Sequence, residues 1–474
     1  MAQEPESTGK RAELPMRLTR LRVKNFRSIA DIDIPLSPLT VLVGPNGSGK
    51  SNVVDALRFV RDVFARGLDQ AVMDREGMGV IQRWGTEGEG VTIGLTMEVT
   101  DAAEAGMVYD NSAGDGVAVY KPISDASIDY EFVIVESAEK SIEIKEEALI
   151  IKVHEENVPT IYISRKGDKL DGKLGDSEWN DLLKSDSKSI KIGNINELYM
   201  PKGLFGRSTA LFDDSDQRNS FRRMNFGAPE KEDNSKGASN EDLKYYWMQC
   251  GGLISSYLNR TVDTLLFYTL NPTDLRQPQQ TLKDAPFDEK GRNLAAVLRR
   301  LSRGKNSGWE ALKFALDQTI TGFETLEVEP VGGYLATKLI YHTESSKPRT
   351  SYIGQESDGT IRILGLLASL QQEPSQPFLC IEEPEANIHP GALAVLAGVI
   401  DEASLRSQVL VTTHSPDMLD HLPVESFLVV EKVGDTTHVG TLDASQIASV
   451  RKRLFTPGEL FRMEGLQRQT EPAS

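Results

Sequence analysis

The stretch Gly44-Pro45-Asn46-Gly47-Ser48-Gly49-Lys50-Ser51 decides the fold, because it fits the phosphate-binding pattern G-x-x-x-x-G-K-[ST]. The apolar run LTVLVG leads into it, and SNVVDALRFVRDVFARGL follows with apolar residues at helical spacing. A glycine-rich turn between a buried strand and a helix lets backbone N–H groups surround phosphate oxygens, and the helix start adds its positive dipole. The pattern and its setting predict a nucleotide site rather than an ordinary strand-to-helix turn.

Two side chains of this stretch have predicted roles toward ATP and Mg²⁺. Lys50 would hold the β- and γ-phosphates, and the Ser51 hydroxyl would ligate the magnesium ion. The predicted ATP-binding residues of this segment are Gly44, Asn46, Gly47, Ser48, Gly49, Lys50, Ser51 and Asn52.

The stretch FLCIEEPEANIHP predicts a catalytic acidic pair. Four apolar residues lead into Glu382 and Glu383. Two carboxylates at the end of a buried strand are costly unless a metal ion or a reacting water uses them. Glu382 would hold Mg²⁺ through water, and Glu383 would act as general base on the attacking water. A strand that runs into a solvated acidic turn is the alternative, which the phosphate-binding pattern disfavours.

Two further elements are ambiguous alone. In VLVTTHSPDML an apolar strand leads to His414, and Ser415-Pro416 opens a helix. His414 would contact the γ-phosphate and distinguish ATP from ADP, although a lone histidine at a strand end is usually satisfied polar structure. Ser357-Asp358-Gly359 precedes the helical run TIRILGLLASL and would form a second anion site, although an ordinary N-cap explains the same residues.

The rest of the chain predicts an α/β fold with an insertion. Strands alternate with helices in both outer parts, which favours a mostly parallel sheet covered by helices. Alternating runs such as YEFVIV and TIYISRK predict an antiparallel β meander over residues 101–190. Residues 205–245 are polar and loop-like, and YYWMQCGGLISSYLNR is predicted to be helical. The chain has no sustained heptad pattern that would predict a long coiled coil.

The order of these motifs resembles that of ABC-type ATPases, in particular the SMC/RecF-like branch with the overcoming-lysogeny-type proteins. The segments that carry the resemblance are NFRSI with VLVGPNGSGKSN, ESDGTIR, IEEPEANIHP and TTHSP, within residues 16–100 and 260–435. The resemblance implies a P-loop NTPase head of the ABC type, a mixed sheet flanked by helices, with a β-rich and helical insertion. The predicted domains are residues 16–100 with the phosphate-binding loop, the insertion 101–260, the second half of the head 261–445, and a tail 446–474.

Further residue roles come from this resemblance alone. Arg27 would approach the adenosine end or the α-phosphate, and Asn46 would help to hold the γ-phosphate and the attacking water. The signature residues Ser357, Asp358 and Gly359 would bind ATP held by a second subunit. Asn387 and His389 would lie in the D-loop at the same dimer interface. For the Q-loop glutamine, Gln82 and Gln277 are both candidates.

Composition limits the partners and the location. The formal charge of −17, from 53 basic and 70 acidic residues, argues against coating nucleic acid through the whole surface. No window approaches the roughly 20 apolar residues of a membrane span, and the polar start contains no export signal, so we expect a cytoplasmic protein without a membrane partner. Cys250 and Cys380, the two cysteines, lack metal-site spacing.

The leading hypothesis is an ATPase whose ATP-dependent homodimerisation, or larger self-association, regulates DNA-linked work in repair, chromosome maintenance or antiphage defence. The segment after TTHSP is shorter than the roughly 100 residues of a TOPRIM-type nuclease domain, so any nuclease or toxin is expected to be a separate effector. The alternative is a nucleotide-dependent clamp that restrains an effector with negligible turnover. A transporter subunit is disfavoured, because the long β-rich insertion is foreign to those subunits.

Overall fold

A computed structural model describes most of the two ends of the chain and parts of its middle. The described residues are 16–100, 105–110, 117–122, 125–137, 139–154, 160–166, 169–175, 190–192, 262, 264–280, 286–304, 308–344 and 347–469. The chain divides into two compact units. Among the described residues, the first unit contains residues 36–54 and 264–469, and the second contains residues 16–35 and those from 55 to 262.

The first unit is built on a mainly parallel sheet, with the strand order β20-β19-β3-β18-β17-β12. Its strands are β3 (Leu39–Val43), β12 (Leu265–Tyr268), β17 (Phe378–Glu382), β18 (Gln408–Thr413), β19 (Phe427–Val433) and β20 (Thr436–Thr441). All neighbours in this order run parallel except β19 and β20, which form a hairpin. Strands β3, β17 and β18 are wholly or almost wholly buried, and each has an apolar centre rather than alternating apolar and polar residues, as expected for parallel strands covered on both faces.

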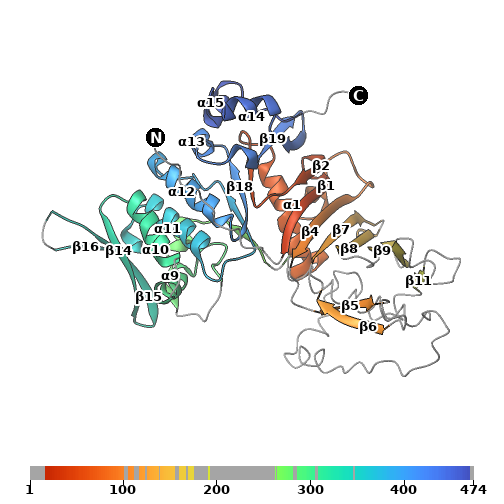
Figure 1. Cartoon of the computed structure of the whole chain (residues 1–474), viewed down its shortest axis with the longest axis horizontal. Helices are drawn as coiled ribbons and strands as arrows, with labels where there is room; N and C mark the ends of the chain where they lie inside the picture. Colours follow the sequence, from red (N-terminus) through yellow and green to blue (C-terminus); the bar gives the residue numbers. More distant parts are fainter. Residues whose placement is uncertain are drawn as a thin grey trace. The chain divides into compact units, whose positions relative to one another are not determined.

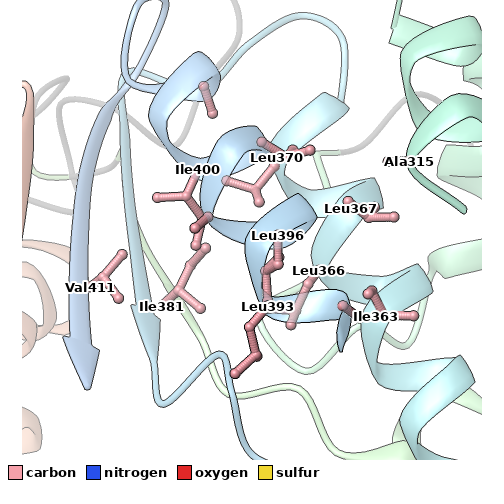
Figure 2. Packing of buried hydrophobic residues seen from close by; sticks show 14 of the residues in the cluster. Ala315, Ile363, Leu366, Leu367, Leu370, Ile381, Leu393, Leu396, Ile400 and Val411 are labelled. Carbon is pink, nitrogen blue, oxygen red and sulfur yellow. The ribbon is translucent and has the colours of Figure 1, made fainter. Parts of the chain in front are cut away.

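Helices pack on this sheet and on each other. The helices of this unit are α8 (Pro272–Leu275), α9 (Leu294–Arg303), α10 (Gly308–Thr319), α11 (Asp358–Gln371), α12 (Pro390–Ala403), α13 (Pro416–Leu419), α14 (Ala444–Arg451) and α15 (Pro457–Met463), with 3-10 turns at Ile353–Gln355 and Val424–Ser426. Figure 2 shows α12 between the strands and α11, with Leu396 and Ile400 near Ile381 of β17. Leu396 is fully buried, and burial of such a side chain contributes about 1.5–3 kcal/mol.

A small antiparallel sheet lies next to α9 and α10 in the same unit (Figure 1). It consists of β13 (Gln279–Gln280), β14 (Phe323–Val331), β15 (Tyr334–Tyr341) and β16 (Arg349–Tyr352). The β14–β15 hairpin turns at Gly332 and Gly333, which have φ values of 57° and 87°. A two-residue hairpin with both φ angles positive favours glycine at both positions, which is why the Gly-Gly pair predicts this turn.

The second unit is antiparallel, with the strand order β11-β10-β9-β8-β7-β4-β1-β2. These strands are β1 (Met16–Phe26), β2 (Ile29–Pro35), β4 (Val91–Thr100), β7 (Asp125–Glu136), β8 (Ile142–Val153), β9 (Thr160–Lys166), β10 (Lys169–Gly175) and β11 (Ile190–Ile192), while β5 (Ala105–Asp110) pairs with β6 (Val117–Pro122). Helix α1 (Lys50–Arg66) begins in the first unit, and α2 (Leu68–Met73) and α3 (Met78–Ile81) follow it. The predicted antiparallel meander is confirmed by β7 to β9.

Some predictions lie outside the described residues. The predicted loop over residues 205–245 lies outside the described ranges. The predicted helix YYWMQCGGLISSYLNR, which contains Cys250, lies outside them too. The predicted domain boundaries at residues 100, 260 and 445 follow the positions of the sequence motifs. This division stays a prediction.

Candidate functional site

Two glycines of the predicted phosphate-binding loop, Gly44 and Gly49, are in close contact with the β19–β20 hairpin. A Cβ atom on Gly44 would lie 2.1 Å from the carbonyl oxygen of Val430, and one on Gly49 would lie 2.1 Å from Thr437 Oγ1. Gly47 and Gly49 also have φ values of 77° and 107°, in the left-handed region that favours glycine. This loop, defined as residues 44–49, therefore needs its glycines both for backbone conformation and for space.

Lys50 begins α1 and is directed back at the loop. It is only 6% exposed, and its Nζ donates hydrogen bonds to the carbonyl oxygens of Gly44 at 2.8 Å and Pro45 at 3.0 Å. Burial lowers the pKa of the Lys50 ammonium, and the negative charges of Glu383 and Glu385 partly oppose that shift. The lysine is thus a buried cation next to the loop and within the field of two carboxylates.

The strand register brings three predicted motifs to one edge of the sheet. Strand β18 lies between β3 and β17, and Thr413 pairs with Val43 at the end of β3. On its other side, Thr412 pairs with Glu382 at the end of β17. Because these strands are parallel, the loop after β3, the acidic pair after β17 and His414 after β18 all follow the carboxyl ends of adjacent strands, where ligands bind in open α/β sheets.

Glu383 has an unusual backbone that several groups hold in place. Its φ is 46°, in the left-handed region, and a non-glycine residue there indicates a constrained position. Its N–H lies 3.0 Å from the carbonyl oxygen and 3.2 Å from the hydroxyl of Thr412, and its own carbonyl accepts a hydrogen bond from Arg362 at 2.9 Å. Its side chain remains 44% exposed, so the carboxylate is accessible while its backbone is fixed.

His414 lies beside two carboxylates, of which the sequence pattern identified only one. Its Nδ1 is 3.4 Å from Glu383 Oε1 and 3.6 Å from Glu385 Oε1. Glu385 also accepts hydrogen bonds from Thr413 Oγ1 at 2.7 Å and from the His414 N–H at 3.1 Å. Sequence reasoning missed Glu385, although a third acidic residue two positions after the catalytic pair is a visible signal.

The predicted signature residues meet the predicted D-loop within the chain. Ser357 caps α11, because its Oγ accepts a hydrogen bond from the Thr360 N–H at 3.1 Å, and this is the ordinary N-cap that the sequence allowed. Asp358 pairs with Arg276 at 2.6 Å. A Cβ on Gly359 would lie 2.7 Å from the carbonyl oxygen of Asn387, so the close approach of the D-loop requires glycine here.

Several other predicted residues have identifiable environments. His389 caps α12 by accepting the Gly391 N–H at its Nδ1. Arg27 lies in the second unit, where it has a φ of 50° and pairs with Asp55 at 2.8 Å. Asn46 and Ser51 are exposed, and Asn52 is half-buried. Gln82 ends α3 and Gln277 follows α8, so both remain candidates for the Q-loop.

The residues at this edge fit a nucleoside triphosphate with a magnesium ion. Within the described ranges, the buried Ser48 Oγ has no hydrogen-bond partner. A Cβ atom at Gly44 or Gly49 would clash with the neighbouring hairpin, so the loop has no room for a side chain at either position. No group of three or more His, Cys, Asp or Glu side chains in the described part of the chain could hold a metal. A hydroxyl and a single carboxylate, as at Ser51 and Glu382, suit Mg²⁺ bound together with substrate phosphates.

Comparison with known proteins gives matches over the same segments. Residues 214–420 match the family described as AAA domain, putative AbiEii toxin, Type IV TA system, and residues 20–67 match a family described as AAA domain. The chain is 58% identical over 43 residues to an OLD nuclease of Thermus scotoductus, covering 9% of this chain and 8% of that protein. It is 43% identical over 58 residues to the DNA replication and repair protein RecF of Brucella abortus, covering 12% and 15%.

The chain therefore spans less than a sixth of the length of these two relatives. Among solved structures, an Smc head bound to the C-winged helix domain of ScpA aligns with 91% of this chain and 99% of its own, at 13% identity and a TM-score of 0.45.

The parallel sheet, the loop after β3 and the acidic end of β17 define a P-loop NTPase of the ABC class. The two family matches and the RecF and OLD relatives agree with this class, because the chain is similar to SMC/RecF-like ABC ATPases. In the described residues, no helix is long and apolar enough to cross a membrane.

Proposed function

We propose that this chain hydrolyses ATP to ADP and phosphate at the edge formed by β3, β18 and β17. The observation that carries this proposal is the register that joins Val43 to Thr413 and Thr412 to Glu382, because it brings the loop and the acidic pair to the same end of the sheet. Backbone N–H groups of residues 44–51 and the Lys50 ammonium would bind the phosphates. Lys50 would exchange its bonds to the Gly44 and Pro45 carbonyls for phosphate oxygens.

Glu383 is the proposed general base. Its carboxylate is half-exposed, and its backbone is fixed by Thr412 and Arg362. In the reaction it would take a proton from the attacking water while the bond between the γ-phosphorus and the ADP oxygen breaks. Ser51 and Glu382 would hold Mg²⁺, which when bound neutralises charge on the β- and γ-phosphates. His414 would contact the γ-phosphate.

ATP-dependent pairing of two heads is the proposed mechanical output. Ser357 and Asp358 are exposed at the start of α11, where a phosphate of a nucleotide held by a second copy can approach the helix N-terminus. Gly359 lies against Asn387, so a ligand at this turn would act on both the signature and the D-loop. Arg27, Asn46 and His389 keep their proposed roles toward nucleotide and partner head.

The proposed setting is DNA-linked work inside the cytoplasm. The names of the relatives, a DNA replication and repair protein RecF and an OLD nuclease, support work on DNA. Repair, chromosome maintenance or antiphage defence, with a separate effector nuclease or toxin, is the proposed setting. Near the start of the chain, Arg20 pairs with Asp33, and Arg22 pairs with Asp129 and Glu131. These two arginines therefore contribute little free positive charge to a DNA contact.

The test compares phosphate release by the wild type and by Glu383→Gln at saturating ATP and Mg²⁺. Loss of a general base lowers turnover by about 10²–10⁴-fold, and we expect a fall in that range with ATP affinity retained. Glu402→Gln, which removes a 55%-exposed carboxylate from α12, is the matched control and should turn over normally. If the wild type is no faster than Glu383→Gln while both bind ATP, the alternative clamp without significant turnover is correct.

A further inference from the structure

Glu385 has a structural position that none of the roles above explains. Its side chain is only 8% exposed. Its Oε1 accepts hydrogen bonds from Thr413 Oγ1 and from the His414 N–H, so one carboxylate oxygen holds two consecutive residues at the end of β18. A buried carboxylate costs free energy unless its charge is compensated, so a residue of this kind specifies a local arrangement rather than simply filling space.

The charges around Glu385 come from three other elements. Burial lowers the pKa values of Lys50 on α1 and Arg362 on α11, and the negative charges of Glu385 and Glu383 partly oppose both shifts. Glu385 is therefore an anion within reach of the loop lysine, the signature helix and the histidine.

The ring of His414 lies between this anion and the proposed base. Its Nδ1 is 3.4 Å from Glu383 Oε1 and 3.6 Å from Glu385 Oε1, both slightly longer than a hydrogen bond. Carboxylate oxygens accept and do not donate, so a histidine nitrogen facing two of them carries its hydrogen. A small rotation of the ring decides which carboxylate receives that hydrogen. Within the described part of the chain, neither His414 Nδ1 nor Glu385 Oε2 has a hydrogen-bond partner.

We propose that Glu385 is a positioning residue that fixes the backbone of Thr413 and His414 and accepts the Nδ1 hydrogen of His414, leaving Glu383 free to act as base. The inference rests on the proposed ATPase function. In the reaction, the water oxygen bonds to the γ-phosphorus, its proton passes to Glu383, and the bond to the ADP oxygen breaks. Glu385 takes no part in that transfer. Without Glu385, the Nδ1 hydrogen would go to Glu383 and occupy the carboxylate oxygen that the attacking water needs.

The experiment is a double-mutant cycle in steady-state kinetics, with Glu385→Ala, His414→Ala and the double variant. We expect Glu385→Ala to lower kcat by about 10–100-fold, the usual effect of removing a group that orients an active-site ligand, with a smaller change in KM for ATP. Added to His414→Ala, the same substitution should lower kcat by less than about threefold, because the imidazole that Glu385 orients is already gone and only the backbone contacts remain. Glu385→Gln keeps an acceptor oxygen for the two hydrogen bonds and should recover part of the rate.

Equal loss of kcat on adding Glu385→Ala to the wild type and to His414→Ala would overturn the proposal. Should Glu385→Ala fail to fold, the cycle is run with Glu385→Gln. The ratio of ATP affinity to ADP affinity is a readout that needs no turnover. We expect both Glu385→Ala and His414→Ala to lower this ratio. If the wild type does not hydrolyse ATP, the proposed ATPase function is wrong. If the affinity ratio is unchanged in Glu385→Ala, the proposed role of Glu385 is wrong. Glu402→Ala, on the exposed face of α12, is the control for loss of one carboxylate.

Discussion

The starts of α1 and α11 are the two helix N-termini that the sequence singled out as anion sites, and they differ in what their polar groups contact. At α1, the buried Lys50 is bonded to loop carbonyls, and two glycines with positive φ lie directly before it. At α11, Ser357 already satisfies the Thr360 N–H, and Asp358 pairs with Arg276. The first combines a buried cation with a glycine-rich backbone that suits an anion, while the second is a complete helix cap.

This difference separates two meanings of the same sequence feature. A small polar residue before a helix is sufficient for a cap, and a cap needs no ligand. A phosphate site additionally needs glycines that let the backbone approach closely, and a cation that burial alone would destabilise. On this basis we propose that α1 holds the nucleotide of its own head, and that α11 engages only when a second head brings a phosphate to it.

The largest expected effect follows from replacing the cation at α1. Lys50→Ala should weaken ATP binding by about a hundredfold or more, because hydrogen bonds to charged groups contribute about 1.5–3 kcal/mol each and tenfold in affinity is about 1.4 kcal/mol. Titration calorimetry with ATP and Mg²⁺ measures this directly. Lys290→Ala, at an exposed lysine away from the loop, should bind ATP like the wild type. Affinity retained in Lys50→Ala would remove the distinction between the two helix starts.

Replacing Ser357 at the start of α11 should have a smaller effect, on stability and on the pairing of heads rather than on ATP binding. Ser357→Ala should cost about 1 kcal/mol of unfolding free energy through loss of the cap, and should leave ATP affinity unchanged. In the Glu383→Gln background, which should accumulate ATP-bound dimers, the added Ser357→Ala should abolish the ATP-dependent rise in mass seen by light scattering. Thr456→Ala, which removes the cap of α15, controls for the stability loss. Dimers that persist without Ser357 would mean that α11 is only a helix cap.

The smallest effect on nucleotide binding and pairing is expected when the partner of Asp358 is replaced, because only stability should change. Arg276 pairs with a carboxylate that is 62% exposed, and exposed ion pairs contribute about 0.2–1 kcal/mol. Arg276→Ala should therefore lower the free energy of unfolding by less than about 2 kcal/mol, which includes its bond to the Glu356 carbonyl, and chemical denaturation can measure this. If Arg276→Ala lowered the free energy of unfolding as much as replacing a buried leucine does, the start of α11 would be held as firmly as the loop at α1.

The sequence predicted those parts of the fold whose signals are local. The strand before the loop, the helix after it, the Gly-Gly hairpin and the alternating strands β7 to β9 each depend on neighbouring residues, and the structure confirms them. The antiparallel return of β20 beside β19 was not specified, and it supplies Thr437, which hydrogen-bonds to the Ser48 carbonyl across 389 positions. No short pattern encodes a contact of that separation.

In the candidate site too, the features that short local motifs encode were predictable, and those that depend on tertiary packing were not. The loop, the acidic pair and His414 are recognisable as short motifs, and parallel strands place them at one edge. The roles of Arg362 and Glu385 depend on packing between α11, the turn after β17 and the end of β18. Sequence also could not decide between Gln82 and Gln277, because both follow short helices whose relation to the nucleotide is tertiary.

The most direct measurement is an experimentally determined structure of Glu383→Gln with ATP and Mg²⁺. The account predicts a triphosphate held by the backbone of residues 44–51 and Lys50, with its γ-phosphate facing position 383 and, in an assembled pair, contacted by Ser357 of the second copy. A nucleotide bound elsewhere, or a γ-phosphate directed away from the end of β17, would contradict it.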